Sequence, residues 1–170
     1  MIKEAKRIGE EQKRGKYSTE ARLVMYEKTI VPTITYNLEC WTKMREKDRK
    51  DLERIQGKAL RSLLHLPEST PYWGLLKETG IWPIERIIHY HRLMLLQNLI
   101  VSEEERLGRL VITAQREEES LWGRYRETRT IAKEIGIEDE WFECDEKLKG
   151  KKREWKRTVK RTVKSKKENI

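Results

Sequence analysis

Residues 45–65 contain the sequence feature that most constrains the fold. At 100° per residue, the apolar side chains of this segment fall within about 80° of one another. They are Leu52, Ile55, Ala59, Leu63 and Leu66, with Leu60 widening the face. This spacing predicts an amphipathic helix, and its apolar face requires other elements to cover it.

The rest of the sequence favours helices as those elements. The 170 residues include only 9 Gly and 4 Pro, too few turn formers for a many-stranded sandwich or barrel. Leu, Ile, Val and Phe make up about 23% of the chain, which allows a modest core. We therefore expect an all-α fold, a small helical bundle.

Four segments are expected along the chain. Residues 1–16 form a polar helix, residues 17–104 the helical core, residues 105–146 a charged helical extension, and residues 147–170 a basic tail that is helical or disordered. Within the core, Ser18 or Thr19 caps a first helix, which Pro32 kinks or ends. Residues 33–41 favour a buried helix over a strand. Residues 84–104 form the most apolar helix, and Gly80 ends the helix before it.

The positive charge is concentrated in the tail. Residues 147–170 contain 12 Lys and Arg against 2 Asp and Glu, whereas residues 1–146 are close to neutral. Clustered cations add their fields within a Debye length, so a polyanionic partner is indicated.

The tail combines its cations with one aromatic ring. Its candidate contact residues for nucleic acid are Lys151, Lys152, Arg153, Trp155, Lys156, Arg157, Lys160, Arg161 and Lys164. Trp155 is either a stacking platform for bases or an apolar anchor. Three other interpretations stay open: a disordered solubilising tail, a nuclear-import patch, and a basic amphipathic helix for an acidic membrane.

A second basic stripe lies opposite the apolar face of the 45–65 helix. Its members are Lys47, Lys50, Arg54, Lys58 and Arg61, spaced three and four residues apart. A straight row of cations suits a phosphate backbone. Cations are equally ordinary on the outer face of an amphipathic helix, so both interpretations stand.

The sequence offers little support for catalysis or for metal binding. The glutamate runs at 103–105 and 117–119 have no His or Cys nearby, and His89 and His91 point about 200° apart on a helix. We expect no catalytic residue, metal, cofactor or small-molecule substrate. Two widely separated cysteines favour a reducing intracellular compartment, and no apolar run is long enough to cross a membrane.

Two groups of residues resemble a known family. The first is Tyr26-x-x-x-Ile30-x-Pro32-x-x-x-Tyr36-x-x-Glu39-x-Trp41, and the second is Leu52-Glu53-x-Ile55-Gln56 followed by Leu60-Arg61-x-x-Leu64-x-Leu66-Pro67. Their order and spacing resemble the region after the polymerase palm in reverse transcriptases of non-LTR (LINE-like) retrotransposons. Asn37 and His65 stand where that family commonly has glycine.

The resemblance implies a helical thumb and post-thumb module that holds a template–primer duplex. It also implies that the palm with its metal-binding aspartates lies upstream, so that this chain is a non-catalytic C-terminal fragment. The expected partners are RNA or an RNA–DNA duplex, and the upstream polymerase domains. The alternative is a helical protein–protein interaction module that docks a partner through Trp73, Trp82 and the helix at 84–101.

Overall fold

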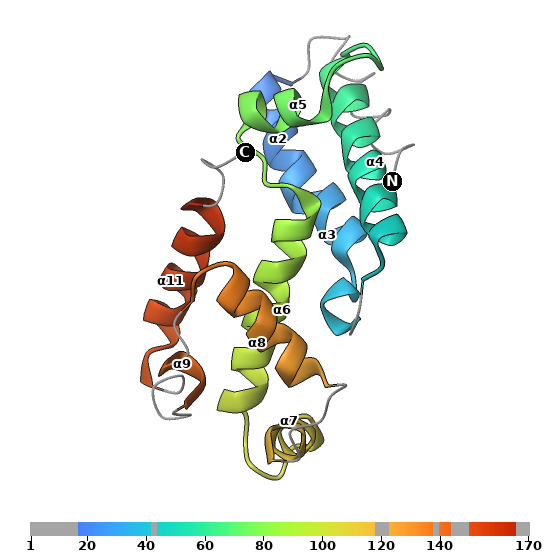
Figure 1. Ribbon diagram of the computed structural model, residues 1–170. Coiled ribbons are helices and arrows are strands. Elements are labelled where there is room, and N and C mark those ends of the chain that lie inside the picture. The colour runs from blue at the N-terminus through green and yellow to red at the C-terminus, as the bar shows by residue number, and fades with distance from the viewer. Residues whose placement is uncertain (1–16, 42–43, 118–122, 138–139, 144–149, 166–170) are drawn as a thin grey trace. The chain divides into compact units, whose positions relative to one another are not determined.

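The computed structural model describes residues 17–41, 44–117, 123–137, 140–143 and 150–165. Within these ranges the chain forms helices and no strand, which confirms the all-α fold class (Figure 1). The elements are α2 (Thr19–Met25), η1 (Tyr26–Ile30), α3 (Val31–Thr35), η2 (Leu38–Cys40), α4 (Glu46–Leu64), α5 (Tyr72–Thr79), α6 (Ile84–Val101), α7 (Leu107–Glu117), α8 (Arg124–Glu134), α9 (Glu140–Glu143) and α11 (Lys152–Ser165). The polar helix expected over residues 1–16 lies outside the described residues.

The chain divides into two compact units. Unit 1 holds the described residues of 1–38 and 44–87, and unit 2 those of 39–43 and 88–170. The boundary falls inside α6, whereas the sequence suggested one core over residues 17–104. Two hydrogen bonds agree with this division. The Ile84 amide at the start of α6 is bonded in unit 1, and Arg92 further along the helix is bonded in unit 2.

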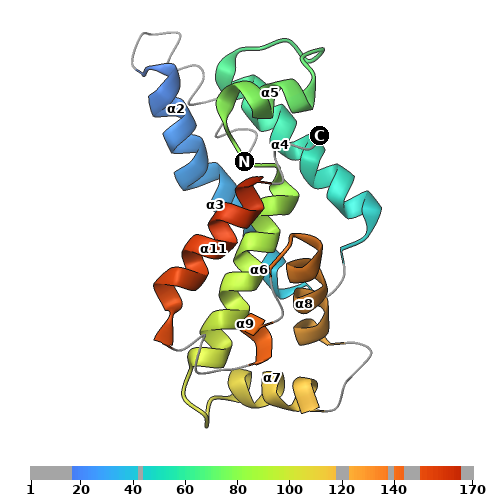
Figure 2. The same ribbon diagram turned by 60° about the vertical axis from the view of Figure 1, so that its left-hand side comes forward.

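In unit 1, α2, η1 and α3 follow one another as a continuous rod (Figure 2). Ser18 caps α2 as expected, its side chain accepting the Ala21 amide at 3.2 Å. Pro32 does not end the helix, contrary to one expectation. The π-helical turn of η1 directly precedes it and widens the backbone where the proline ring would meet the carbonyl of Lys28.

A buried glutamine joins α4 to α5 and α6. The Gln56 amide nitrogen donates to the Trp82 carbonyl at 2.9 Å, and its oxygen accepts the Ile84 amide at 2.8 Å and the Tyr72 hydroxyl. The Ile84 amide is one of the unpaired donors of the α6 N-terminus, so Gln56 caps that helix from a distance. Gly57 lets Tyr72 approach, since a Cβ there would lie 3.3 Å from its ring.

Two non-glycine residues of unit 1 adopt left-handed backbone conformations. Asn37 has φ 59° after α3, and His65 has φ 55° as the residue that ends α4. The Leu66 amide bonds back to the Arg61 carbonyl at 2.9 Å, which closes the helix end. Gly80, with φ 70°, ends α5 as the sequence indicated.

Unit 2 contains the rest of α6 and the elements that follow. Its α6 residues Leu93, Leu96 and Ile100 are buried, and α7 runs crosswise near the end of that helix (Figure 2). The segment at residues 39–41 is held by two arginines. Arg92 donates to the Trp41 carbonyl at 2.7 Å and Arg124 to the Cys40 carbonyl at 3.0 Å. The expected buried helix over 33–41 is therefore replaced by α3, a turn and the short η2.

Candidate nucleic-acid interface

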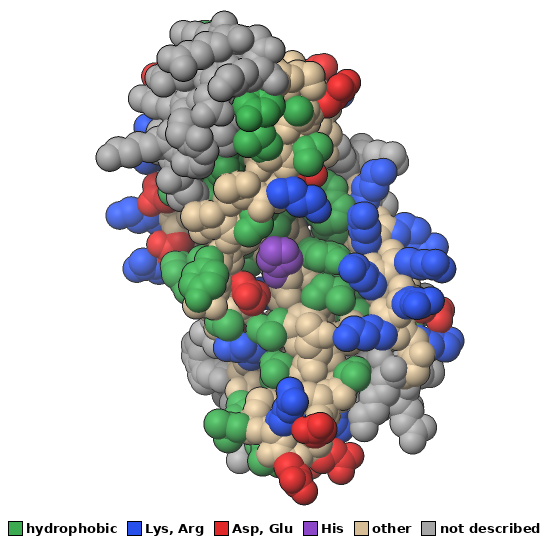
Figure 3. All heavy atoms as spheres, turned by 180° about the vertical axis from the view of Figure 1, so that it is seen from behind, with side chains coloured by type: hydrophobic (Ala, Val, Ile, Leu, Met, Phe, Trp, Pro, Cys, Tyr) green, Lys and Arg blue, Asp and Glu red, His purple; other side chains and the backbone are tan. Residues whose placement is uncertain are grey.

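The strongest basic surface of the described residues is the outer face of α11. All seven Lys and Arg side chains of the helix are exposed, as is Lys151 just before it. Figure 3 shows these side chains gathered on the right of the view. They are Lys152, Arg153, Lys156, Arg157, Lys160, Arg161 and Lys164.

The opposite face of α11 is buried. Trp155, Val159 and Val163 recur every fourth residue and are 1%, 0% and 2% exposed. The Trp155 ring packs edge-on against Phe142 and tilted against Trp141, with centroids 5.7 Å and 5.4 Å away. This contact corrects one expectation: Trp155 is the apolar anchor of the helix and offers no ring face on which a base could stack.

Charge compensation differs between the two predicted basic surfaces. The 14 residues of α11 include seven cations and one acid, Glu154, which lies 3.4 Å from Lys151. The 19 residues of α4 include six cations and four acids. The field of α11 is therefore largely uncompensated along its own length, and that of α4 is partly cancelled.

The ion pairs of α4 show this cancellation directly. Lys50 lies 3.5 Å from Glu46, and Arg54 lies 3.3 Å from Asp51. Hydrogen bonds from Arg49 hold the pKa of the Glu46 carboxyl below its usual range. The Glu46 carboxylate is thus charged at neutral pH and competes with any phosphate for Lys50.

Four of the five predicted α4 cations face solvent. Lys47, Lys50, Arg54 and Lys58 are exposed, whereas Arg61 is half-buried. The Arg61 Nε donates to the Thr70 carbonyl at 2.9 Å and so ties the loop before α5 to α4. This structural role takes Arg61 out of the solvent-facing stripe.

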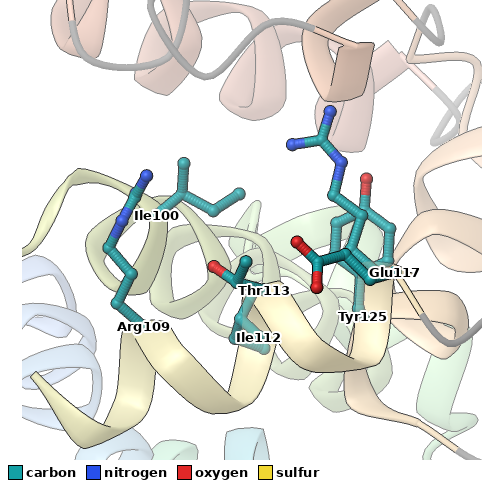
Figure 4. A pocket seen from close by; sticks show the side chains of 7 residues that line it. Ile100, Arg109, Ile112, Thr113, Glu117 and Tyr125 are labelled. Carbon is teal, nitrogen blue, oxygen red and sulfur yellow. The ribbon is translucent and has the colours of Figure 1, made fainter. Parts of the chain in front are cut away.

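One pocket of about 430 Å³ opens in unit 2. Figure 4 shows Arg109, Ile112, Thr113 and Glu117 on α7 facing it, with Ile100 and Tyr125 on neighbouring elements. None of the residues that line it is a histidine or cysteine, and it brings together none of the predicted contact residues. We assign no chemistry to this pocket.

Metal chemistry is equally unsupported in the described part of the chain. It contains no group of three or more His, Cys, Asp and Glu side chains able to hold a metal ion. His91 is half-buried near Glu39, and burial lowers the pKa of its imidazole. No helix within the described ranges is long and apolar enough to cross a membrane.

Sequence reasoning missed one residue that positions α4. Gln56 was assigned no role, although it is the buried polar group that fixes α4 against α5 and α6. No family model, curated protein or solved structure matches the chain.

Proposed function

We propose that this chain is a non-catalytic helical module that binds the phosphate backbone of nucleic acid, with the exposed face of α11 as its main contact surface. One observation carries the proposal: seven exposed cations lie along one ordered helix with a single acid among them. Cations arranged in this way gain affinity by releasing counterions from phosphates, without reading sequence.

The burial of the apolar face favours nucleic acid over a membrane as the polyanion. A basic amphipathic helix binds an acidic bilayer by inserting its apolar side. In α11 that side, formed by Trp155, Val159 and Val163, is already packed inside the protein. Only the charged side remains for a partner.

The protein–protein alternative receives less support. The helix that it relies on, α6, buries Ile84, Ile88 and Leu93 within this chain. Trp73 remains 48% exposed on α5, but Trp82 is half-buried beside the Gln56 contact. A docking face built on Trp73 alone is small.

The resemblance to the thumb of non-LTR retrotransposon reverse transcriptases is part of this proposal. Left-handed backbone at Asn37 and His65 supports it, since glycine, common there in that family, adopts this conformation with least strain. On this basis the chain would lie beside upstream polymerase domains and contact a template–primer duplex. A nucleic-acid partner also places the function inside the cell, and in the nucleus if the tail serves import.

Charge reversal tests the proposal. We expect Lys156→Glu, Arg157→Glu and Lys160→Glu together to abolish binding of an RNA–DNA or DNA duplex, measured by fluorescence anisotropy. Lys50→Glu, Arg54→Glu and Lys58→Glu on α4 should weaken binding less, because acids already compensate that face.

A matched control separates surface location from net charge. Lys28→Glu, Lys77→Glu and Arg126→Glu reverse three exposed cations of η1, α5 and α8, which belong to neither basic surface. This variant should bind almost as the wild type does. Equal losses in the control and the α11 variant would contradict a local interface, and no binding by the wild type at 50 mM salt would contradict the function.

A further inference from the structure

Helix α7 turns its apolar side to solvent. Leu107, Leu110 and Val111 are 76%, 52% and 45% exposed, and Ala114 is exposed as well. At 100° per residue these four side chains lie within an arc of about 100°. We call them the apolar face of α7. Their spacing of i, i+3, i+4 and i+7 is typical of a helix side that packs against another element.

The side of α7 that is buried is the more polar one. Arg109 and Ile112 are buried and face the pocket (Figure 4), each about 150° around the helix from the centre of the apolar face. Gly108 brings α7 close to α6, since a Cβ there would lie 2.8 Å from the Leu99 side chain. A surface helix normally buries its apolar side and exposes its polar side. The reversed order in α7 indicates that a further element covers its apolar face.

The size of the apolar face suits a single helix. Its members are consecutive on one side of the helix, and contiguous apolar exposure marks a contact with a partner, whereas scattered apolar residues do not. The 11 residues of α7 extend over about 16 Å. One helix lying along this length covers the face and forms a small, transient interface.

Acidic side chains stand at one end of the apolar face. Glu103, Glu104 and Glu105 are all exposed in the turn that leads into α7. Arg106 is the cation that follows them, and it lies 3.4 Å from Glu103. Three acids and one cation give this end a negative field, which favours a partner with positive charge.

The same charges disfavour two other occupants. A second copy of the chain would bring its own acidic turn to this end when parallel, and its Glu117 when antiparallel. Arg116 does not offset this, because it lines the pocket and lies about 170° around the helix from the centre of the apolar face. An acidic bilayer is disfavoured because helices that bind it carry cations beside their apolar side.

We infer that α7 docks a basic amphipathic helix of a partner protein. The apolar residues of that helix pack on Leu107, Leu110 and Val111, and its lysines or arginines lie toward the turn at residues 103–105. The inference does not depend on the proposed function, because α7 shares no residue with the basic surface of α11.

Designed helical peptides supply the chemistry of the partner. The basic peptide has leucine at positions i, i+3, i+4 and i+7, lysine at both ends and alanine elsewhere, over about 16 residues so that a helix can form. In two matched peptides, glutamate replaces the lysines or glutamine replaces the leucines. Fluorescence anisotropy of each labelled peptide with the full chain gives its affinity.

We expect the basic peptide to bind at least about tenfold more tightly than either matched peptide, because both the apolar area and the charge contribute. Equal binding of the glutamate peptide would exclude a basic partner. Equal binding of the glutamine peptide would exclude an apolar contact, and no binding of the basic peptide would overturn the inference as a whole.

Substitutions in the chain test the location. Leu107→Gln together with Leu110→Gln should lower the affinity for the basic peptide at least about tenfold and leave the helix content unchanged in circular dichroism, because both side chains are exposed. Val24→Gln on α2 is the matched control, since Val24 is 54% exposed and lies outside α7. An unchanged affinity in the leucine variant, or an equal loss in the control, would overturn the placement on α7.

Neutralising the acidic turn tests the charge of the partner. Glu103→Gln, Glu104→Gln and Glu105→Gln together should weaken binding of the basic peptide at least about threefold and reduce its dependence on salt. If affinity and salt dependence both stay unchanged, the choice of a basic partner is wrong.

Two further measurements separate this inference from its competitors. A wild-type dimer in sedimentation velocity that becomes a monomer when Leu107 and Leu110 are replaced by glutamine would assign the face to a second copy and overturn the inference. The charge-reversal variant of α11 should bind the basic peptide at least as tightly as the wild type does. The proposed function and this inference can therefore fail separately, and loss of peptide binding in the α11 variant would contradict docking on α7.

Discussion

Replacement of Trp155 by alanine probes the contact on which the ordered basic surface depends. The indole is 1% exposed and contacts the rings of Trp141 and Phe142. Truncation of a buried Trp or Phe to Ala typically costs about 3–5 kcal/mol, from lost transfer free energy and the cavity left behind. Each aromatic pair adds about 0.5–1.5 kcal/mol to the packing that is lost.

The same substitution should also change nucleic-acid binding. A detached helix of 14 residues is marginal in water, so α11 would lose its helical order and the ordered arrangement of its cations. We expect Trp155→Ala to lower the free energy of unfolding by about 3–4 kcal/mol and to reduce the salt slope of duplex binding, although no charge has changed. Urea denaturation followed by circular dichroism gives the first quantity, and anisotropy titration the second.

A conservative variant serves as the control. Trp155→Phe keeps an aromatic ring in the cluster and removes the indole N–H, which is buried without a hydrogen-bond partner among the described residues. It should stay within about 1 kcal/mol of the wild type, because the loss of area is offset by removal of an unpaired donor. A cost below about 1 kcal/mol for Trp155→Ala would refute the docking of α11 through this ring.

Three further predictions concern unit 1. Gln56→Leu should lower the free energy of unfolding by about 3–5 kcal/mol, because the Trp82 carbonyl and the Ile84 amide would be left unpaired at a cost of about 1–3 kcal/mol each. Urea denaturation that shows no loss of stability would contradict the hydrogen-bond network of Gln56. His65→Gly should raise the free energy of unfolding by about 0.5–1 kcal/mol, because the relief of left-handed backbone strain exceeds the conformational entropy that glycine loses on folding. A lower thermal midpoint for this variant would contradict the prediction. Burial raises the pKa of Tyr26 from 10.0 to about 12, so the unfolded chain loses its proton first and stability falls by about 2–3 kcal/mol as pH rises through that interval. Tyr26→Phe should flatten this decline in urea titrations between pH 9 and 12, and an unchanged slope would exclude Tyr26 as its source.

The helices were predictable where their determinants are local. The apolar spacing of 45–65 gave α4, and the cap at Ser18 and the stop at Gly80 follow from the preferences of single residues. The expectation that Pro32 ends the helix was wrong because the effect of a proline depends on the turn before it. Here the wider turn of η1 accommodates the proline ring.

The surfaces were harder to predict because burial is decided by distant residues. From the sequence alone, Trp155 could stack on a base or pack in the core. The fold decides between the two by placing Phe142 and Trp141 against its ring. Arg61 belongs to the α4 stripe by spacing, but its bond to the Thr70 carbonyl depends on how the following loop returns. The charges of α11 were correctly located as a cluster, and the folded helix exposes all seven of its cations.

The salt dependence of duplex binding tests the central claim most directly. If α11 neutralises at least about four phosphates, log affinity should fall with log salt with a slope of about −3.6, a loss of about 100-fold between 50 and 200 mM. When Lys156, Arg157 and Lys160 are replaced by glutamate, the magnitude of the slope should fall below about 1, or binding should vanish. A wild-type affinity that is indifferent to salt, or a reversed variant with an unchanged slope, would contradict a phosphate-binding role for α11.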